Sequence, residues 1–132
     1  MSHSIVTHPH AVEDLATVWR TDSDAAYLIA VLIQELEEDP DLLSELGTDK
    51  FVHETDPRFN IRKWVTQHDE RNFLWRISPY YADGRNCDYR IIYAYDCSRL
   101  EYVVLAVVEK EAFKYDVQHP ISRRIAHDYL QL

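Results

Sequence analysis

The chain has 132 residues, of which 46% are hydrophobic and 28% charged, a composition typical of one compact domain with a single hydrophobic core. We therefore expect residues 1–132 to form one domain, with a loose segment at 1–11. No apolar run approaches the ~18 to 20 residues of a membrane helix, so we expect a soluble, cytoplasmic protein with no membrane partner. Only two glycines are present, which excludes the glycine-rich loops of kinases and dinucleotide-binding enzymes.

Cysteine and histidine spacing gives no metal or disulfide pattern. Cys87 and Cys97 flank an apolar run that is typical of a strand. Ten strand residues would hold the two cysteines roughly 33 Å apart, whereas a disulfide requires Cα atoms within about 7 Å. No C-x-x-C or H-x-x-x-H spacing occurs, so the sequence predicts no metal site and no cofactor. His8 and His10, on either side of Pro9, are expected to have no structural role.

The net charge of −9 is unevenly distributed along the chain. Residues 1–49 contain eleven acidic residues and one basic residue, whereas residues 50–132 contain twelve acidic and thirteen basic residues. The acidity therefore belongs to the first third of the chain, and the remainder is able to form a local cationic groove.

The first elements are predicted from β-branched content and from helical spacing. Residues 12–20 are short and partly β-branched, and we interpret them as a first strand. At 22–38, apolar residues recur at helical spacing with acidic residues on the outer side, which predicts an amphipathic helix. Thr21 and Asp24 resemble a capping box at its start.

A second, short helix is predicted at 40–46. Asp39 is placed as its N-cap, Pro40 occupies the first helical position, and Gly47 is a natural residue beyond its end. The two helices form a pair with acidic outer faces, which are the least suited of all surfaces to contact phosphate.

Extended segments follow in the second half of the chain. Residues 59–66 alternate loosely and fit either an edge strand or a turn-rich segment. Apolar alternation predicts strands at 73–78 and 88–96, with an Asp-Gly turn between them. The continuous apolar run at 102–108 predicts a strand buried on both faces.

Pro120 opens a C-terminal helix, because apolar residues follow it at i, i+4 and i+8. The predicted fold class is therefore α+β: an antiparallel sheet of three to four strands packed against an N-terminal helical pair, with a C-terminal helix.

Two arginines interrupt otherwise apolar strands, and they are the first candidates for a functional site. Arg76 and Arg90 lie on strands joined by one hairpin, so both guanidinium groups are able to point from the same sheet face. One interpretation is internal pairing with a carboxylate. The other is an anion site, because a guanidinium matches phosphate oxygens in a bidentate manner.

Three further residues extend this candidate site. Lys110 follows the last apolar strand, and Tyr115 and His119 come within ten residues of it. With the two arginines, they supply the charge and the proton donor and acceptor that metal-free RNA cleavage requires. A surface packing role for Tyr115 and a helix-start role for His119 are the alternatives.

Three motifs resemble the RelE/HigB/ParE superfamily of bacterial type II toxins. They are LWRI at 74–77, YRIIYAYD at 89–96 and YVVLAVVEKEAFKYD at 102–116, and the order of elements is similar too. The resemblance implies a RelE-like fold and an endoribonuclease, or mRNA interferase, that enters the ribosomal A site. It also implies a cognate antitoxin as partner, with mRNA and the ribosome as targets.

The resemblance also implies roles for individual residues. Arg90 matches the position of the phosphate-stabilising arginine, and Arg76 corresponds to a basic residue of the preceding strand. Lys110 lies where a further catalytic arginine is common, and Tyr115 lies near the family's C-terminal tyrosine. His119 has no firm position in the family pattern, but the ordinary histidine pKa near 6.5 suits a catalytic acid or base.

The chain departs from active RelE-like nucleases at the last strand, where Glu109 and Glu111 flank Lys110 and would oppose RNA phosphates. This leaves a second function class open: a non-catalytic or ParE-like, gyrase-directed binding protein on the same fold. That class predicts an internal ion pair between one of the arginines and Asp88, Asp96 or Glu109.

Overall fold

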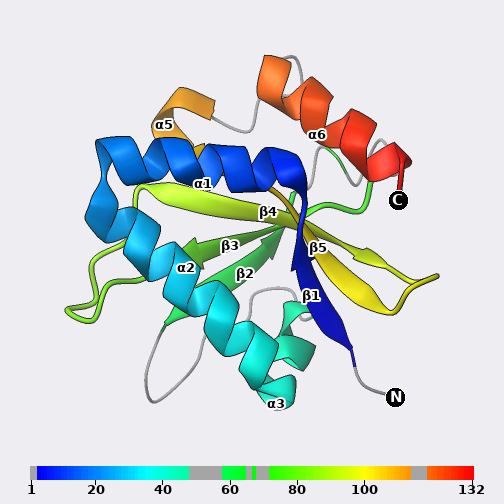
Figure 1. The fold of residues 1–132 in the computed structure, drawn as a ribbon, viewed down its shortest axis with the longest axis horizontal. Coiled ribbons are helices and arrows are strands. Elements are labelled where there is room, and N and C mark those ends of the chain that lie inside the picture. The colour runs from blue at the N-terminus through cyan, green and yellow to red at the C-terminus, as the bar shows by residue number, and fades with distance from the viewer. Residues whose placement is uncertain (1–2, 48–57, 65–66, 68–71, 114–118) are drawn as a thin grey trace.

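A five-stranded sheet organises the part of the chain that the structure, a computed structural model, describes: residues 3–47, 58–64, 67, 72–113 and 119–132. The strand order is β1-β5-β4-β3-β2, with β1 parallel to β5 and the other neighbours antiparallel. The elements are β1 (Ser4–Thr7), α1 (Pro9–Thr21), α2 (Ser23–Glu38), α3 (Pro40–Ser44), a 3-10 turn η1 (Glu45–Gly47), β2 (Phe59–Lys63), β3 (Trp75–Pro79), β4 (Tyr89–Asp96), β5 (Glu101–Glu109), α5 (Lys110–Phe113) and α6 (Pro120–Leu130). The predicted α+β class is confirmed, with five strands rather than three to four (Figure 1).

The strand predicted at 12–20 is wrong, because this segment belongs to helix α1. Pro9 occupies the first turn of the helix, and the His8 side chain caps it by accepting a hydrogen bond from the backbone N of His10 at 3.0 Å. Ala11, Leu15 and Val18 then follow at helical spacing and contribute to the core. The helix cap and the helical spacing of apolar residues therefore outweigh the strand preference of the β-branched residues.

The expected loose segment at 1–11 is also wrong within the described residues. Ser4–Thr7 form β1, whose residues pair in parallel register with Glu101 to Val104 of β5. The backbone N of His8 continues this pairing by donating to the carbonyl of Val104 at 2.8 Å. His8 therefore has a structural role, contrary to the prediction, and joins the sheet to α1.

The predicted helices at 22–38 and 40–46 are confirmed as α2 and as α3 with η1. The cap of α2 differs from the predicted Thr21 and Asp24 pair, because the Asp22 carboxylate accepts the hydrogen bond from the backbone N of Ala25. Asp39 caps α3, as predicted, by accepting from two backbone N–H groups.

The strands at 73–78, 88–96 and 102–108 are confirmed as β3, β4 and β5, and the undecided segment 59–66 contributes the edge strand β2. A bulge in β5 opposite Ile92 and Tyr93 reverses the alternation of its side chains. The apolar residues of β5 contribute to the cores on both sides of the sheet, which agrees with the predicted burial of this strand on two faces.

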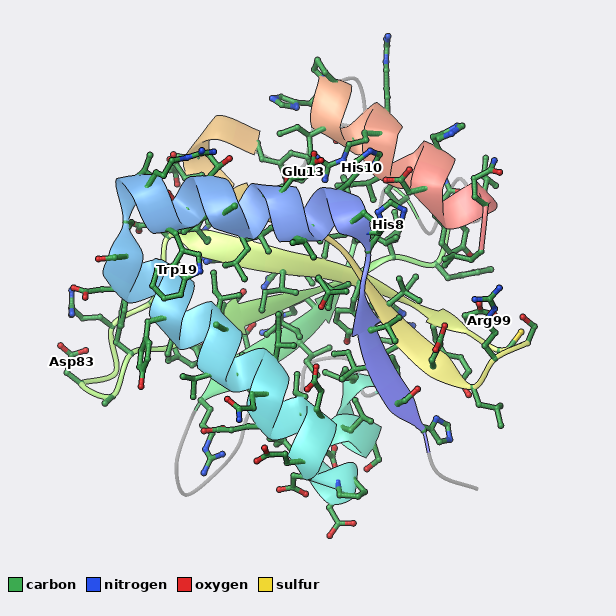
Figure 2. The ribbon with its side chains drawn as sticks, viewed as in Figure 1. His8, His10, Glu13, Trp19, Asp83 and Arg99 are labelled. Carbon is green, nitrogen blue, oxygen red and sulfur yellow. The ribbon has the colours of Figure 1, made fainter. Side chains whose placement is uncertain are left out.

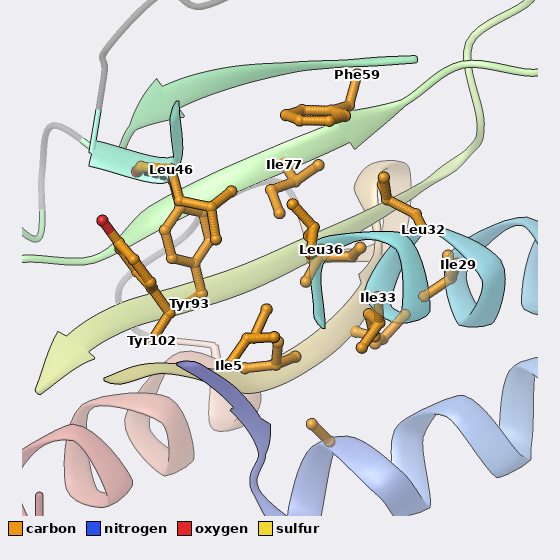
Figure 3. Close-up of a cluster of buried hydrophobic side chains, with 14 of the residues drawn as sticks. Ile5, Ile29, Leu32, Ile33, Leu36, Leu46, Phe59, Ile77, Tyr93 and Tyr102 are labelled. Atoms are coloured by element: carbon orange, nitrogen blue, oxygen red, sulfur yellow. Dashed lines mark hydrogen bonds between the residues drawn. The ribbon is translucent and has the colours of Figure 1, made fainter. Parts of the chain in front are cut away.

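The larger core lies between α1, α2 and α3 and one face of the sheet (Figure 3). It contains the side chains labelled in the figure: Ile5, Ile29, Leu32, Ile33, Leu36, Leu46, Phe59, Ile77, Tyr93 and Tyr102. The buried hydroxyl of Tyr93 donates a hydrogen bond to the carbonyl of Leu46 at 2.5 Å. This bond ties the end of η1 to the central strand.

Substituting Tyr93→Phe is expected to lower the free energy of unfolding by about 1 to 2 kcal/mol, because the Leu46 carbonyl loses its buried donor. Urea unfolding of the two proteins measures the difference. Tyr27→Phe is the control, since the Tyr27 side chain is exposed and its hydroxyl is free to bind water. Equal losses in both variants would contradict the structural role of the Tyr93 hydroxyl.

A second, smaller core covers part of the opposite sheet face. Ile125 of α6 and Phe113 of α5 pack there against Trp64, Ile92 and Leu105. The predicted C-terminal helix is therefore confirmed, and it lies on the side of the sheet away from α2. The uncovered remainder of this face carries the polar side chains considered below.

The two cysteines are free, as predicted from their separation. Cys87 is buried and Cys97 is exposed. Burial raises the pKa of the Cys87 thiol, so this group stays protonated and unreactive near neutral pH.

None of the helices in the described ranges combines the length and the apolar character needed to cross a membrane.

Candidate active site

A polar pocket of about 220 Å³ opens on the sheet face opposite α1 and α2. Strand alternation explains its position: Ile61, Ile77 and Ile91 point into the larger core, so their neighbours Arg76 and Arg90 point to the other face. The lining residues are Asn60, Arg76, Ser78, Tyr80, Asn86, Arg90 and Lys110. Three residues predicted for the site, Arg76, Arg90 and Lys110, are thus brought together.

Arg90 is the most deeply placed cation of the pocket, with 6% of its surface exposed. Its Nη1 donates to the carbonyls of Cys87 at 2.5 Å and Tyr89 at 2.9 Å. Among the described residues, no carboxylate forms an ion pair with it. Backbone carbonyls therefore fix the guanidinium, and Nε and Nη2 remain available to a ligand in the pocket.

Arg76 belongs to a hydrogen-bonded row of side chains on β2 and β3. Its Nη1 donates to Asn60 Oδ1 at 3.2 Å and, through a shorter contact, to the hydroxyl of Ser78. Asn60 in turn donates from Nδ2 to the hydroxyl oxygen of Tyr80 at 2.5 Å. The row holds a guanidinium and a phenol at fixed positions on one wall of the pocket.

The internal ion pairs predicted by the non-catalytic alternative are absent from the described part of the chain. Neither Arg76 nor Arg90 is paired with Asp88, Asp96 or Glu109. The Asp96 carboxylate instead accepts hydrogen bonds from Ser98, which lower its pKa.

Arg62 adds positive charge next to this site. It lies directly opposite Arg76 in the register of β2 and β3, on the same sheet face. Like charges at directly opposed positions repel each other, so an anion bound at this face would lower the energy of both guanidinium groups. Arg62 of β2 therefore adds to the positive charge that Arg76 and Arg90 bring to this sheet face.

Lys110 begins α5 and lines the pocket with an exposed side chain. Its backbone N donates to the carbonyl of Asp88 at 2.9 Å, which holds it beside the start of β4. Glu109 pairs in register with Tyr89 and lines a separate groove beside α1. Glu109 is therefore not among the residues that line the pocket.

His119 lies outside the pocket. Its Nδ1 accepts a hydrogen bond from the backbone N of Ile121 at 3.1 Å and caps α6, and its ring contacts Phe113. It lines the groove that also contains Glu109. His119 therefore starts helix α6, which was the alternative to a catalytic role. It does not lie with Arg76 and Arg90 in the pocket. Tyr115 lies outside the described residues.

No family model matches the sequence, and no curated protein matches it.

Three solved structures are similar to the chain. A mutant of the E. coli toxin RelE in the free state has 14% sequence identity, with 87% of this chain and 90% of that chain covered and a TM-score of 0.42. The archaeal RelE–RelB complex from Pyrococcus horikoshii has 16% identity, with 83% and 97% covered and a TM-score of 0.44. The toxin–antitoxin complex RelBE2 from Mycobacterium tuberculosis has 17% identity, with 83% and 99% covered and a TM-score of 0.39.

Sequence reasoning missed Asn60 and Tyr80 as parts of the pocket. The alternation at 59–66 places Asn60 on the same side as Arg62 and opposite Phe59, so the sequence carries a signal for Asn60 when this segment forms a strand. Tyr80 follows Pro79 at the end of β3 and has no pattern of its own. It reaches the pocket because an isolated bridge to Asn86 holds the chain beyond the strand.

Proposed function

We propose that this protein is the toxin of a bacterial type II toxin–antitoxin system and that it cleaves mRNA at the pocket formed by Arg76, Arg90 and Lys110. The observation that carries the proposal is Arg90, a deeply buried guanidinium held by backbone carbonyls in an open polar pocket without a described carboxylate partner. A buried cation of this kind is costly unless an anion compensates it. The phosphodiester of RNA supplies such an anion.

The proposed reaction is an attack of a ribose 2′-hydroxyl on the adjacent phosphorus, with departure of the 5′ oxygen. Negative charge builds up on the non-bridging phosphate oxygens, where Arg76 and Arg90 stabilise it. The ammonium group of Lys110 adds charge at the pocket rim. The Tyr80 hydroxyl, held by Asn60, is a described group of this pocket that is able to take part in proton transfer.

The sequence resemblance extends the proposal to partners. A cognate antitoxin would keep the toxin inactive, and the ribosome would present the mRNA, so the protein would act in the cytoplasm. The distribution of charge supports a surface for RNA on one side, because the acidic residues among positions 3–47 lie on α1, α2, α3 and η1 or cap these helices. These helices cover the sheet face opposite the pocket.

The test is induced expression of the wild type and of Arg90→Ala in a bacterial host, with growth and cleavage of a reporter mRNA followed together. The wild type is expected to arrest growth and to cleave the reporter, and Arg90→Ala is expected to do neither. Arg99→Ala is the matched control, since Arg99 is an exposed arginine of the β4–β5 turn and should behave as the wild type. Thermal unfolding of the purified variants establishes that each is folded.

Two other outcomes would overturn the ribonuclease proposal. Growth arrest without mRNA cleavage would indicate another target, such as gyrase. Absence of arrest and of cleavage in the wild type would indicate a binding protein without catalytic activity.

A further inference from the structure

Three side chains that commonly bind metal ions meet away from the candidate active site, where the start of α1 lies beside α6. They are His8 and His10, at the start of α1, and Asp128, near the end of α6. Their ligand atoms all lie within 4.8 Å of one another. Figure 2 shows both histidines at the beginning of α1 beside the C-terminal helix.

Asp128 is the unusual member of this cluster, because it is a carboxylate with 4% of its surface exposed. Within the described residues, its ion-pair partners are the two histidines: His10 Nδ1 lies 2.6 Å and His8 Nδ1 3.8 Å from its Oδ2. A buried carboxylate is costly without a compensating positive charge, and the side chains that face it here are two imidazoles, which also bind metal ions.

We propose that His8, His10 and Asp128 form a binding site for a divalent transition metal ion of the zinc class. Two imidazoles and one carboxylate are a donor set that zinc uses in proteins, with water in a fourth position. Tetrahedral bonds of about 2.0 Å place ligand atoms about 3.3 Å apart. The 3.8 Å separation of His8 Nδ1 and Asp128 Oδ2 needs to shorten slightly, and the 2.6 Å contact of His10 Nδ1 with Asp128 Oδ2 needs to open to admit the ion.

Contacts within the protein fix both elements that carry the proposed ligands, the start of α1 and helix α6. The backbone N of His8 donates to the Val104 carbonyl of the sheet. Helix α6 is fixed by Ile125 in the second core and by the ion pair of Arg124 with Asp14 of α1. A site built on anchored elements loses little conformational freedom when the ion binds.

The two histidines are accessible to solvent, and an ion bound to them would link two helices. The His10 side chain is 42% and the His8 side chain 24% exposed, so the ion and its water reach the cluster from solvent. The His8 Nδ1 lone pair that would bind the ion now accepts the capping bond of α1; this single hydrogen bond is exchanged for a metal–nitrogen bond. A bound ion would join the first turn of α1 to the last turns of α6 and would hold the C-terminal helix on the sheet.

The test is a zinc titration of the purified full chain after treatment with a chelator, by calorimetry and by thermal unfolding. The wild type is expected to bind one Zn²⁺ and to unfold at a higher temperature when zinc is present. Asp128→Asn and His10→Gln are expected to bind zinc at least roughly 100-fold more weakly, since each removes a ligand. His127→Gln is the matched control, because His127 is an exposed histidine of the same helix outside the cluster.

Cobalt substitution locates the site independently of stability. The d–d absorption of Co²⁺ in the wild type and in His127→Gln is expected to be intense, as in four-coordinate sites, and to be lost in Asp128→Asn. Zinc binding that is equally tight in Asp128→Asn, or a wild type that binds no zinc, would overturn the proposal. Neither readout depends on RNA cleavage, so failure of the proposed ribonuclease function would leave this result unaffected.

Discussion

Arg90→Lys is expected to lower the rate of RNA cleavage by about 100- to 1000-fold, the usual effect of removing one donor that stabilises transition-state charge. Lysine keeps the positive charge, but it carries one ammonium group in place of a planar fork of five N–H donors. In the wild type, Nη1 is occupied by the carbonyls of Cys87 and Tyr89. Two other nitrogens are then left for the phosphate. A single ammonium group is unable to satisfy the carbonyls and the phosphate together.

The measurement is single-turnover cleavage of mRNA in a purified translation reaction. Arg76→Lys is expected to have a similar defect, because it also breaks the row that runs through Asn60 to Tyr80. Arg99→Lys, in the exposed β4–β5 turn, serves as the matched control and should retain the wild-type rate. If Arg90→Lys cleaved as fast as this control, directional hydrogen bonds from Arg90 would not be part of the mechanism.

Asp14→Ala is expected to lower the free energy of unfolding by about 2 to 4 kcal/mol, the largest stability effect that we predict. Strand β1 pairs with β5 only from Glu101 to Val104, so beyond Val104 no strand among the described residues borders the outer edge of β5. The Asp14 carboxylate covers this edge by accepting a hydrogen bond from the backbone N of Val107 at 3.1 Å.

Arg124, on α6, binds the same Asp14 carboxylate. Its guanidinium binds both Asp14 carboxylate oxygens, at 2.9 and 2.7 Å, and also donates to the carbonyl of Leu105 at 3.3 Å. The bonds to Asp14 raise the pKa of Arg124. Loss of Asp14 therefore leaves a half-buried cation without its partner and an N–H of β5 without its acceptor.

A double-mutant cycle of Asp14→Ala and Arg124→Ala, followed by urea unfolding, measures the coupling between these two groups. The ion pair of Asp83 with Arg85 is the control. Its side chains are 57% and 71% exposed, and solvent screens such a pair, so Asp83→Ala should change stability little. If the losses in free energy of unfolding caused by Asp14→Ala and Arg124→Ala were additive, Asp14 and Arg124 would stabilise the fold separately.

Much of the fold was predictable because its signals are local. Asp39 and Pro40 define the start of α3, and Pro120 defines the start of α6; caps and proline act within one helical turn. Alternation likewise placed Arg76 and Arg90 on one sheet face, since the direction of a strand side chain depends only on its position in the strand. The misreading at 12–20 arose where two local signals disagreed and the proline and cap at Pro9 and His8 prevailed.

The sequence by itself determined the α+β class, α2, α3, α6, the three central strands and the shared face of the two arginines, all of which follow from caps and periodicity within short segments. Only the tertiary structure decided which distant segments meet. The parallel pairing of β1 with β5, the contact of Asn60 with Tyr80 and the approach of His10 to Asp128 join residues up to 118 positions apart. No local spacing encodes such contacts, because they result from packing both faces of one sheet.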